Sequence, residues 1–422
     1  MDADTNVSER MVPQMKTALR RGWRDLNTVQ FGMAPAHALT LGPVDTATGS
    51  FLDLLNGTRG LVLLREEGRR MGLPDGHVDR LVARLTRAGL LDDARGGGPA
   101  ADRLRRKEAV MERLRPDLAS LSLLATGPGE AIGRLAARGS LRVRVNGAGR
   151  VGTLVASLLT AAGVGEVDVC DSGRVAPGDV APGGHPADSV GERRAESARR
   201  SARRHAPGRP SRRGPKDTPD ASPAAAAGID GPGLSLVIMA PRDDVAVHAP
   251  DPAGAAALLA SGTPHLYAGV VEATGVVGPL VLPGETGCAG CLQETRADRD
   301  PTWPRLVAQW RSGAPRTARA CDLTLATTVA GLTAAHALTF LDGRTPASAG
   351  ARWEVSLPAL HWHARPVAPH PACPCGAAER TGDGDTVDAG EGRATMAVQG
   401  PSKESRREAD AARPAGTWRA HV

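Results

Sequence analysis

The sequence predicts an α/β protein with a Rossmann-like core that contains a structural zinc site, preceded by a small winged-helix-like domain. Three observations lead to this prediction: a glycine-rich turn between two apolar runs, two close pairs of cysteines, and an N-terminal stretch that mixes short strand and helix patterns. The expected organisation is a disordered start at 1–12, a winged-helix-like domain at 13–94, a linker at 95–102, a core at 103–376 with a disordered insertion at 206–233, and a disordered tail at 377–422.

The composition restricts the class of protein. A length of 422 residues suits two or three domains, and with aromatic residues at only 2% the cores must be built from Leu, Val and Ala. No apolar run reaches about 18 residues, which predicts a protein without membrane spans, and we expect it in the cytoplasm. The six cysteines would be reduced there, so paired cysteines indicate metal binding rather than disulfides. The net charge of +6 is concentrated at 193–216 without aromatic side chains to stack on bases, so nucleic-acid binding is not expected.

The N-terminal region has the pattern of a compact small domain. Two short strands are expected at 29–32 and 38–41. Three helices are expected at 50–55, 61–71 and 75–88. The third helix is the clearest, because apolar residues recur on one face at helical spacing and Asp75 can cap its first turn. Two strands and three helices in about 80 residues predict a winged-helix-like fold.

This region resembles the PqqD-like peptide-recognition domain of enzymes that modify ribosomal peptides. The resemblance rests on the segments FLDLLNGTR at 51–59 and LTRAGLL at 85–91. It implies that the domain binds a leader peptide as an added strand at the edge of its sheet. Two alternatives remain open: a DNA-binding domain, for which the mixed charges of the third helix are unfavourable, and a packing or dimerisation domain.

The best-defined feature is a strand, turn, helix and strand between 143 and 171. The two strands and the helix between them are expected at 143–146, 154–162 and 167–170. The glycines of the G-x-G-x-x-G turn, and the acid that ends the second strand, are Gly147, Gly149, Gly152 and Asp171. This arrangement is typical of a nucleotide-binding βαβ unit, in which the turn approaches a phosphate and the acid binds a ribose hydroxyl. The alternative is a glycine-rich turn that binds nothing.

Further elements are expected on both sides of this unit. The predicted helices lie at 102–114, 130–138, 189–205, 253–261 and 323–341. The predicted strands lie at 234–240, 265–270, 276–282, 353–357 and 360–367.

Two close cysteine pairs carry the strongest local chemistry. They form a C-x-x-C and a C-x-C motif at Cys288, Cys291, Cys373 and Cys375. Four thiolates are the tetrahedral set that zinc prefers in structural sites, and such a site leaves no open position for catalysis. His370 is a spare ligand in case one sulfur does not reach. A redox C-x-x-C motif and unrelated buried thiols are the alternatives.

With these pieces in order, residues 141–376 resemble the ThiF-like family of the ubiquitin-activating-enzyme superfamily. Beyond the turn, the acid and the cysteines, the resemblance rests on Val190-Gly191, Gly278-Pro279-Leu280 and a helix that follows Cys321. It implies adenylation of the C-terminal carboxylate of a peptide or small protein with ATP and magnesium, a homodimer, and a purely structural zinc ion.

Several residues that the family uses in catalysis differ in this chain. The second acid, the Asn and the Arg of the family's loop fall on Gly173, Asp179 and Pro182, and its phosphate-binding Lys falls on Arg194. The magnesium-holding Asp falls on Arg242 or, one residue later, on Asp243. Arg150 replaces a glycine of the turn, and Cys321 stands where some members carry a reactive cysteine, although a buried thiol is the more common role for such a residue.

Three hypotheses follow. The first is a catalytically degenerate ThiF-like protein that binds the leader of a precursor peptide and presents it to a YcaO-type partner enzyme. The second is an active adenylyltransferase that uses Arg150, Arg194 and Asp243 as substitutes. The third is a nucleotide-sensing regulator that binds DNA.

Overall fold

The computed structural model describes residues 10–208, 233–313 and 318–382. Most of the stretches predicted as disordered at 1–12, 206–233 and 377–422 lies outside these residues. The described parts of the first and last stretches differ from the prediction. Met11 and Val12 are both buried, Met11 against the N-terminal core, and α15 (Ala377–Gly382) is a helix that begins at a fully buried alanine.

The N-terminal domain contains two small antiparallel sheets and three helices around one core. Its first part contains β1 (Pro13–Met15), β2 (Arg21–Trp23), β3 (Val29–Phe31), β4 (Leu39–Leu41) and α2 (Thr46–Phe51). A 3₁₀ turn (Leu52–Leu54), α3 (Leu61–Arg70), α4 (His77–Arg87) and β5 (Leu91–Asp93) complete the domain. β3 lies between β2 and β4, and β1 pairs with β5. The prediction that Asp75 caps α4 is wrong, because Gly76 at φ +70° is the N-cap residue and no side chain caps the helix.

Three helices connect this domain to the core: α5 (Gly98–Arg105), α6 (Glu108–Leu124) and α7 (Glu130–Arg138). The sequence predicts a helix that ends before Pro116, but α6 continues through this proline. Proline removes one helical hydrogen bond. The helix continues because Leu114 and Leu121, on either side of Pro116, are buried together in one apolar cluster.

The core is built on a mixed seven-stranded sheet with the order β12-β11-β10-β9-β8-β6-β7. Its parallel half consists of β6 (Arg142–Asn146), β7 (Glu166–Cys170), β8 (Leu236–Met239) and β9 (His265–Val271). Its antiparallel half continues from β9 with β10 (Thr274–Val281), β11 (Ala351–Ser356) and β12 (Trp362–Pro366).

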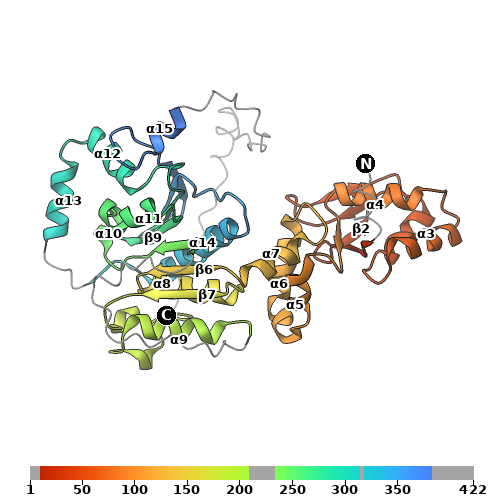
Figure 1. The fold of residues 1–422 in the computed structure, drawn as a ribbon, viewed down its shortest axis with the longest axis horizontal. Helices are drawn as coiled ribbons and strands as arrows, with labels where there is room; N and C mark the ends of the chain where they lie inside the picture. Colours follow the sequence, from red (N-terminus) through yellow and green to blue (C-terminus); the bar gives the residue numbers. More distant parts are fainter. Residues whose placement is uncertain (1–9, 209–232, 314–317, 383–422) are drawn as a thin grey trace, which may run out of the picture. The chain divides into compact units, whose positions relative to one another are not determined.

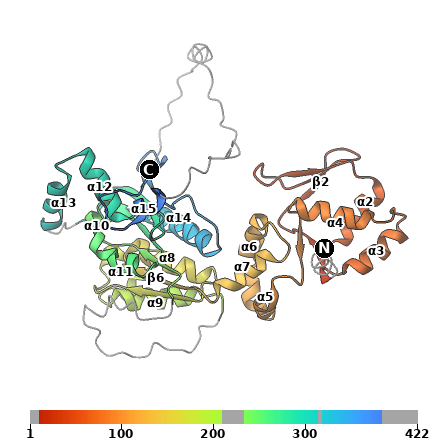
Figure 2. The same cartoon turned by 45° about the horizontal axis from the view of Figure 1, so that its top comes forward.

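Helices cover both faces of the sheet (Figures 1 and 2). On one face, α8 (Arg150–Ala161), α9 (Arg194–His205) and α14 (Leu323–Leu341) share the main apolar cluster with alternate residues of the strands, such as Leu266 and Ala268 of β9. The other face carries α10 (Asp244–His248), α11 (Ala256–Ala260), α12 (Ala289–Arg299) and α13 (Trp303–Ser312). In both views α12 and α13 lie across the sheet from α9.

The predicted fold class is therefore confirmed: the core is a Rossmann-like α/β unit with a cluster of four cysteines. One described helix, α14, is long and apolar enough to cross a membrane. In this fold α14 packs on α8, β9 and β10, and its face from Leu325 to Ala337 is buried in the main apolar cluster.

Candidate functional site

The glycine turn connects β6 to α8 and needs glycine at its first and last positions. Gly147 has φ +105°, and a Cβ there would lie 2.0 Å from the carbonyl oxygen of Ala240. A Cβ on Gly152 would lie 2.0 Å from the carbonyl oxygen of Gly147. A side chain at position 147 would push the turn away from the end of β8, and one at position 152 would push the turn away from α8. The middle glycine of the motif, Gly149, is the N-cap residue of α8.

Asp171, the predicted ribose acid, lies directly beside this turn. Its Oδ2 accepts the N–H of Ala148 at 2.9 Å, and its Oδ1 accepts the N–H of Gly173 at 2.7 Å. Oδ1 also accepts from Nε of Arg194 at 2.9 Å. Burial raises the pKa of the Asp171 carboxyl, but the hydrogen bonds from Arg194, Ala148 and Gly173 outweigh it, so the pKa lies below its ordinary value. Asp171 is therefore a carboxylate held by the protein itself.

A chain of ion pairs extends from Asp171 across the site. Arg194 contacts Asp171 at 2.9 Å and Asp179 at 3.7 Å, and Arg242 contacts Asp179 at 2.6 Å. We call Asp171, Arg194, Asp179 and Arg242 the ion-pair chain. Both carboxylates are buried, with side-chain exposures of 8% and 4%. Within the described part of the molecule, these two arginines are thus neutralised by protein carboxylates.

Gly173 makes the position of Arg194 possible. A Cβ on Gly173 would lie 2.1 Å from Nη2 of Arg194. A side chain at position 173 would therefore require the end of the Arg194 side chain to shift. The glycine at 173 and the arginine at 194 belong to one packing arrangement.

The remaining candidate residues contact nearby protein groups. Nη1 of Arg150 donates to the carbonyl oxygen of Cys321 at 2.8 Å. Oδ1 of Asp243 accepts the N–H of Ala246 at 2.9 Å and so caps α10. Burial raises the pKa of the Cys321 thiol and Arg150 only partly offsets this, so the sulfur is not an activated thiolate. Pro182 lies in an exposed loop.

Two cavities adjoin the turn. The first has a volume of about 490 Å³ and extends from Asp171 and Gly147 to Tyr267 on β9, with Asp243 and Asp251 in its wall. The second has a volume of about 500 Å³ and is lined by Arg150, Asp179 and Cys321, among others. Pro241, Arg242 and Arg319 line both cavities. The turn therefore stands between two spaces, each large enough for a small organic ligand.

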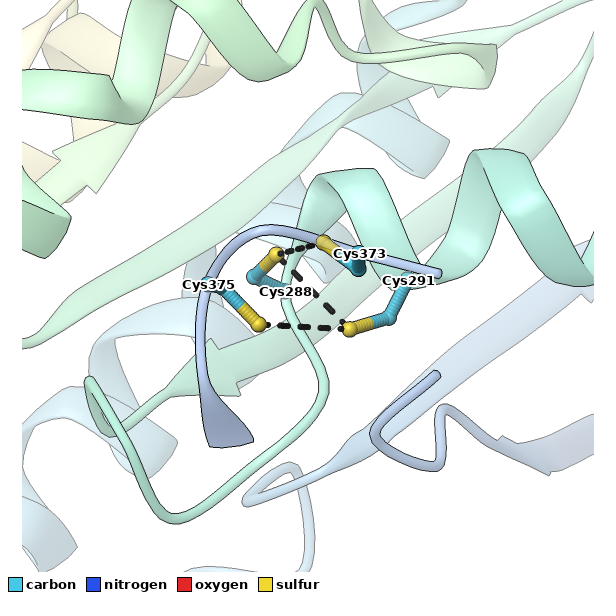
Figure 3. A group of neighbouring side chains, drawn as sticks. All are labelled: Cys288, Cys291, Cys373 and Cys375. Carbon is cyan, nitrogen blue, oxygen red and sulfur yellow. Dashed lines mark hydrogen bonds between the residues drawn. The ribbon is translucent and has the colours of Figure 1, made fainter. Parts of the chain in front are cut away.

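The four cysteines form one cluster, drawn in Figure 3. Their sulfur atoms all lie within 4.8 Å of one another. The Sγ atoms are separated by 3.9 Å in the pair Cys288–Cys291 and by 3.6 Å in the pairs Cys288–Cys373 and Cys291–Cys375. A tetrahedral zinc ion with Zn–S bonds of about 2.3 Å places its ligands about 3.8 Å apart, so these distances fit such an ion.

His370 is not needed as a ligand in this cluster. Its Nε2 contacts Oδ2 of Asp298 at 2.8 Å, and its backbone N–H donates to Sγ of Cys291 at 3.3 Å. The N–H group would stabilise negative charge on a ligating sulfur, which is the usual role of a group next to a metal site. The two cysteine motifs thus supply all four ligand atoms, which are sulfurs.

A family model described as the ThiF family matches residues 132–375, which is more than half of the chain. The chain belongs to the ThiF family. The matched range includes the glycine turn, the ion-pair chain and all four cysteines. The comparison with curated proteins gave no match.

Solved structures share this ThiF fold over most of the chain. The E. coli enzyme MccB with ATP superposes with a TM-score of 0.60 at 14% identity, covering 86% of this chain and 99% of that one. The microcin C7 biosynthetic enzyme MccB with N-formylated MccA gives 0.59 at 14% identity over the same shares. PaaA gives 0.59 at 15% identity, covering 84% of this chain and 99% of that one. The likeness extends beyond the ThiF-matched range, so it includes part of the N-terminal domain.

The structure brings the predicted nucleotide residues together but adds residues that the sequence did not single out. Tyr267, Asp251 and Arg319 line the first cavity. His185 is fully buried behind the turn, with Nε2 2.8 Å from the carbonyl oxygen of Ala148 and Nδ1 2.8 Å from Oγ of Ser197. None of these residues stands in a motif; only the folded sheet brings them beside the glycines.

Proposed function

We propose that the protein binds the leader of a ribosomal precursor peptide and presents that peptide to a separate modification enzyme of the YcaO type, with a ThiF core that has kept its cavity but lost adenylation. Its N-terminal domain would hold the leader. The cysteine cluster would hold a structural zinc ion, and the chain would function in the cytoplasm as a homodimer.

The ion-pair chain is the observation that carries this proposal. Adenylation needs cations on the phosphates of ATP and an acid that holds magnesium. Here Arg194 is paired with Asp171 and Asp179. Arg242, one of the two residues on which the family's magnesium-holding acid falls, is paired with Asp179. A paired cation contributes little to phosphate binding, and losing one charge-stabilising group typically costs about 10²–10³ in rate. The loss of several such groups supports a core without catalysis.

The N-terminal sheet supports peptide binding. Among the described strands, β4 pairs only with β3, which leaves its other edge open for an added strand. Leu39 on β4 is 40% exposed and lines a cavity of about 330 Å³ beside the end of α4. An open strand edge beside a hollow with an apolar side chain suits an extended peptide. MccB, which has the same fold, has been solved with MccA and with N-formylated MccA, which agrees with a bound partner for this chain as well.

An active adenylyltransferase is the second candidate, and the first cavity favours it. Asp243 lines this cavity, and among the contacts of the described residues only its Oδ1 is used, as a helix cap, which leaves Oδ2 for a magnesium ion. Arg319 lines both cavities as an exposed cation. MccB, which has the same fold, has been solved with ATP.

The third hypothesis, a DNA-binding regulator, receives less support. Phosphate contact requires basic side chains that are free to face a duplex. Around α4, Nε and Nη2 of Arg65 both donate to Oδ1 of Asp79. Nη2 of Arg84 donates to the carbonyl oxygen of Gly42. These arginines connect parts of the domain.

The deciding experiment measures ATP–pyrophosphate exchange and peptide binding on the same samples of the full-length protein. Candidate precursor peptides, each with a fluorescent label, are titrated with the protein and then added at saturation to the exchange assay with magnesium. We expect saturable peptide binding without exchange above the level of the protein alone. Exchange that depends on a bound peptide would overturn the scaffold proposal in favour of an active enzyme, and the absence of binding to every peptide would overturn both.

A further inference from the structure

A further cavity, of about 550 Å³, lies where the connecting helices α5, α6 and α7 meet the ends of α8 and α9. We call it the helix-end cavity. It shares no lining residue with the two cavities beside the glycine turn or with the cavity beside β4. Its volume is in the range of pockets that hold small organic ligands, so it is a separate candidate binding site.

Direct contacts fix the walls of the helix-end cavity. Arg138 of α7 forms a buried ion pair with Asp342 at 2.7 Å, and its Nη1 donates to the carbonyl oxygen of Ala162 at 3.0 Å. On the other side of the cavity, Nη1 of Arg113 on α6 donates to the carbonyl oxygen of Ala206, which follows α9, at 2.7 Å. The connecting helices are therefore held against the ends of α8 and α9.

The wall of this cavity is aliphatic. No aromatic residue lines it, so a flat ring would find no stacking partner there. Gly163, at φ +91°, follows the C-cap of α8 without a side chain, which leaves room beside Leu114. An aliphatic chain that displaces water from such a wall gains free energy with each methylene that it buries. The larger apolar residues of the wall are Leu104, Val110, Leu114, Leu135 and Val164.

The charged residues that line the cavity are both cations. They are Arg103 of α5 and Lys107, the N-cap residue of α6. Both are exposed, and neither has a carboxylate partner within the described residues. The neighbouring acids Asp102 and Glu108 do not line the cavity, and Asp102 is paired with Arg105 at 2.9 Å. The cavity therefore favours an anionic group at its open side.

The carbonyl groups at the ends of the surrounding helices already have donors. The carbonyl oxygen of Ala137, on α7, accepts the N–H of Ser140 at 3.0 Å. That of Thr160, on α8, accepts the N–H of Gly163 at 3.1 Å. After α9, the carbonyl oxygen of Ala206 accepts from the arginine of α6 described above. Since these acceptors are paired, the two cations determine the charge of the ligand.

We propose that the helix-end cavity binds an aliphatic carboxylate. The chain of the ligand packs against the apolar wall, and its carboxylate lies between Arg103 and Lys107. The planar guanidinium of Arg103 holds both carboxylate oxygens, while Lys107 adds a second positive charge. The site does not include the glycine turn, the ion-pair chain or β4. It therefore adds a ligand to the proposed function, and its occupancy does not depend on nucleotide or leader-peptide binding.

Calorimetric titration of the full-length protein with three probes tests this assignment. The probes are decanoate, octanoate and decyltrimethylammonium, which has a chain of similar length to decanoate but the opposite charge. Arg103→Gln/Lys107→Gln removes both cations of the site. Arg106→Gln/Arg115→Gln is the matched control, because it removes two exposed cations of the same region that do not line the cavity. Ala136→Phe fills the cavity from α7.

We expect one decanoate to bind per chain and decyltrimethylammonium not to bind. Octanoate has two fewer methylenes to bury and should bind about 10- to 15-fold more weakly than decanoate. Arg103→Gln/Lys107→Gln should weaken decanoate binding about 5- to 10-fold, the effect of two solvent-exposed charge contacts, whereas the control variant should change it less than about twofold. Ala136→Phe should abolish decanoate binding, because the ring occupies the space of the chain.

Four results would each overturn the assignment: no decanoate binding to the unmodified protein, equally tight binding of decyltrimethylammonium, equal losses in the two double variants, or decanoate binding that survives Ala136→Phe. Circular dichroism checks that the variants are folded. If Ala136→Phe does not fold, the two double variants still decide, because they change only exposed side chains. Peptide binding and ATP–pyrophosphate exchange on the same samples test the proposed function separately, so failure of the carboxylate site leaves that function standing.

Discussion

Replacing Arg194 with alanine tests whether the ion-pair chain is a structural part of the core. Arg194 donates to Asp171 at 2.9 Å through Nε and to the carbonyl oxygen of Arg174 at 3.0 Å through Nη1. Its side chain is 15% exposed and that of Asp171 is 8% exposed. Removing one partner of such a buried pair leaves a buried charge and costs about 3–5 kcal/mol. Asp171 would keep the N–H groups of Ala148 and Gly173, so we expect the lower end, about 3 kcal/mol.

A control for this measurement lies on the same helix. Arg199 contacts Asp168 at 2.9 Å, but the two side chains are 37% and 36% exposed. Exposed pairs contribute about 0–1 kcal/mol, so Arg199→Ala should be close to neutral. Urea unfolding followed by circular dichroism compares both variants with the unmodified protein. If Arg194→Ala costs no more than Arg199→Ala, the ion-pair chain does not hold the site together and Arg194 is available to a ligand.

The pH dependence provides a second check on the same pair. The folded-state pKa of Asp171 lies below its ordinary value, so the pair stabilises the protein above the unfolded-state pKa of about 4. This contribution is lost as the pH falls through the folded-state pKa. The stability difference between Arg194→Ala and the unmodified protein should therefore be full at pH 7 and shrink below about pH 4. A difference that is constant over this range would mean that the cost arises from packing alone.

Three further predictions concern other parts of the molecule. Cys288→Ser should remove one equivalent of zinc per chain, measured by elemental analysis, whereas Cys170→Ser, outside the cysteine cluster, should retain it. Leu39→Asp on β4 should weaken leader-peptide binding at least about tenfold by placing a charge at the open edge, while Val62→Asp on α3, 67% exposed, should not; equal effects would place the peptide elsewhere. Burial first, then Arg296, lowers the pKa of His248 to about 4, so stability should fall between pH 6.5 and pH 4, and His248→Phe should flatten that slope in urea titrations.

The long periodic elements could be predicted from the sequence because each carries its own pattern. The helix at 130–138 and the helix at 323–341 have the predicted boundaries, and β6, α8 and β7 form the predicted unit. Of the three-residue strands, β3 and β4 were predicted from their apolar residues, whereas β1, β2 and β5 were missed. All three residues of β2 are exposed, so it carries no apolar pattern that could predict a strand. The continuation of α6 through Pro116 was missed, because the sequence shows the hydrogen bond that a proline removes but not the packing of Leu114 and Leu121 that compensates it.

The candidate site divides in the same way. Its glycines and Asp171 stand in a motif and were found, whereas the pairing of Arg194 with Asp171 depends on how two loops meet in space. The sequence shows a glycine at 173 and an arginine at 194 as two separate departures from the family pattern. Only the packing distance of 2.1 Å between a Cβ at 173 and the guanidinium shows that they are linked.

This linkage determines what single substitutions toward the family pattern would do to the core. Restoring an acid at 242 would take Arg242 away from Asp179, whose side chain is 4% exposed, and would place two carboxylates side by side. Restoring an acid at 173 would require the end of the Arg194 side chain to shift, and the new carboxylate would compete with Asp171 for the guanidinium. Each reversal therefore disturbs the ion-pair chain before it contributes a catalytic group. The glycine at 173 leaves room for the arginine at 194, which is why we assign this half of the site to structure.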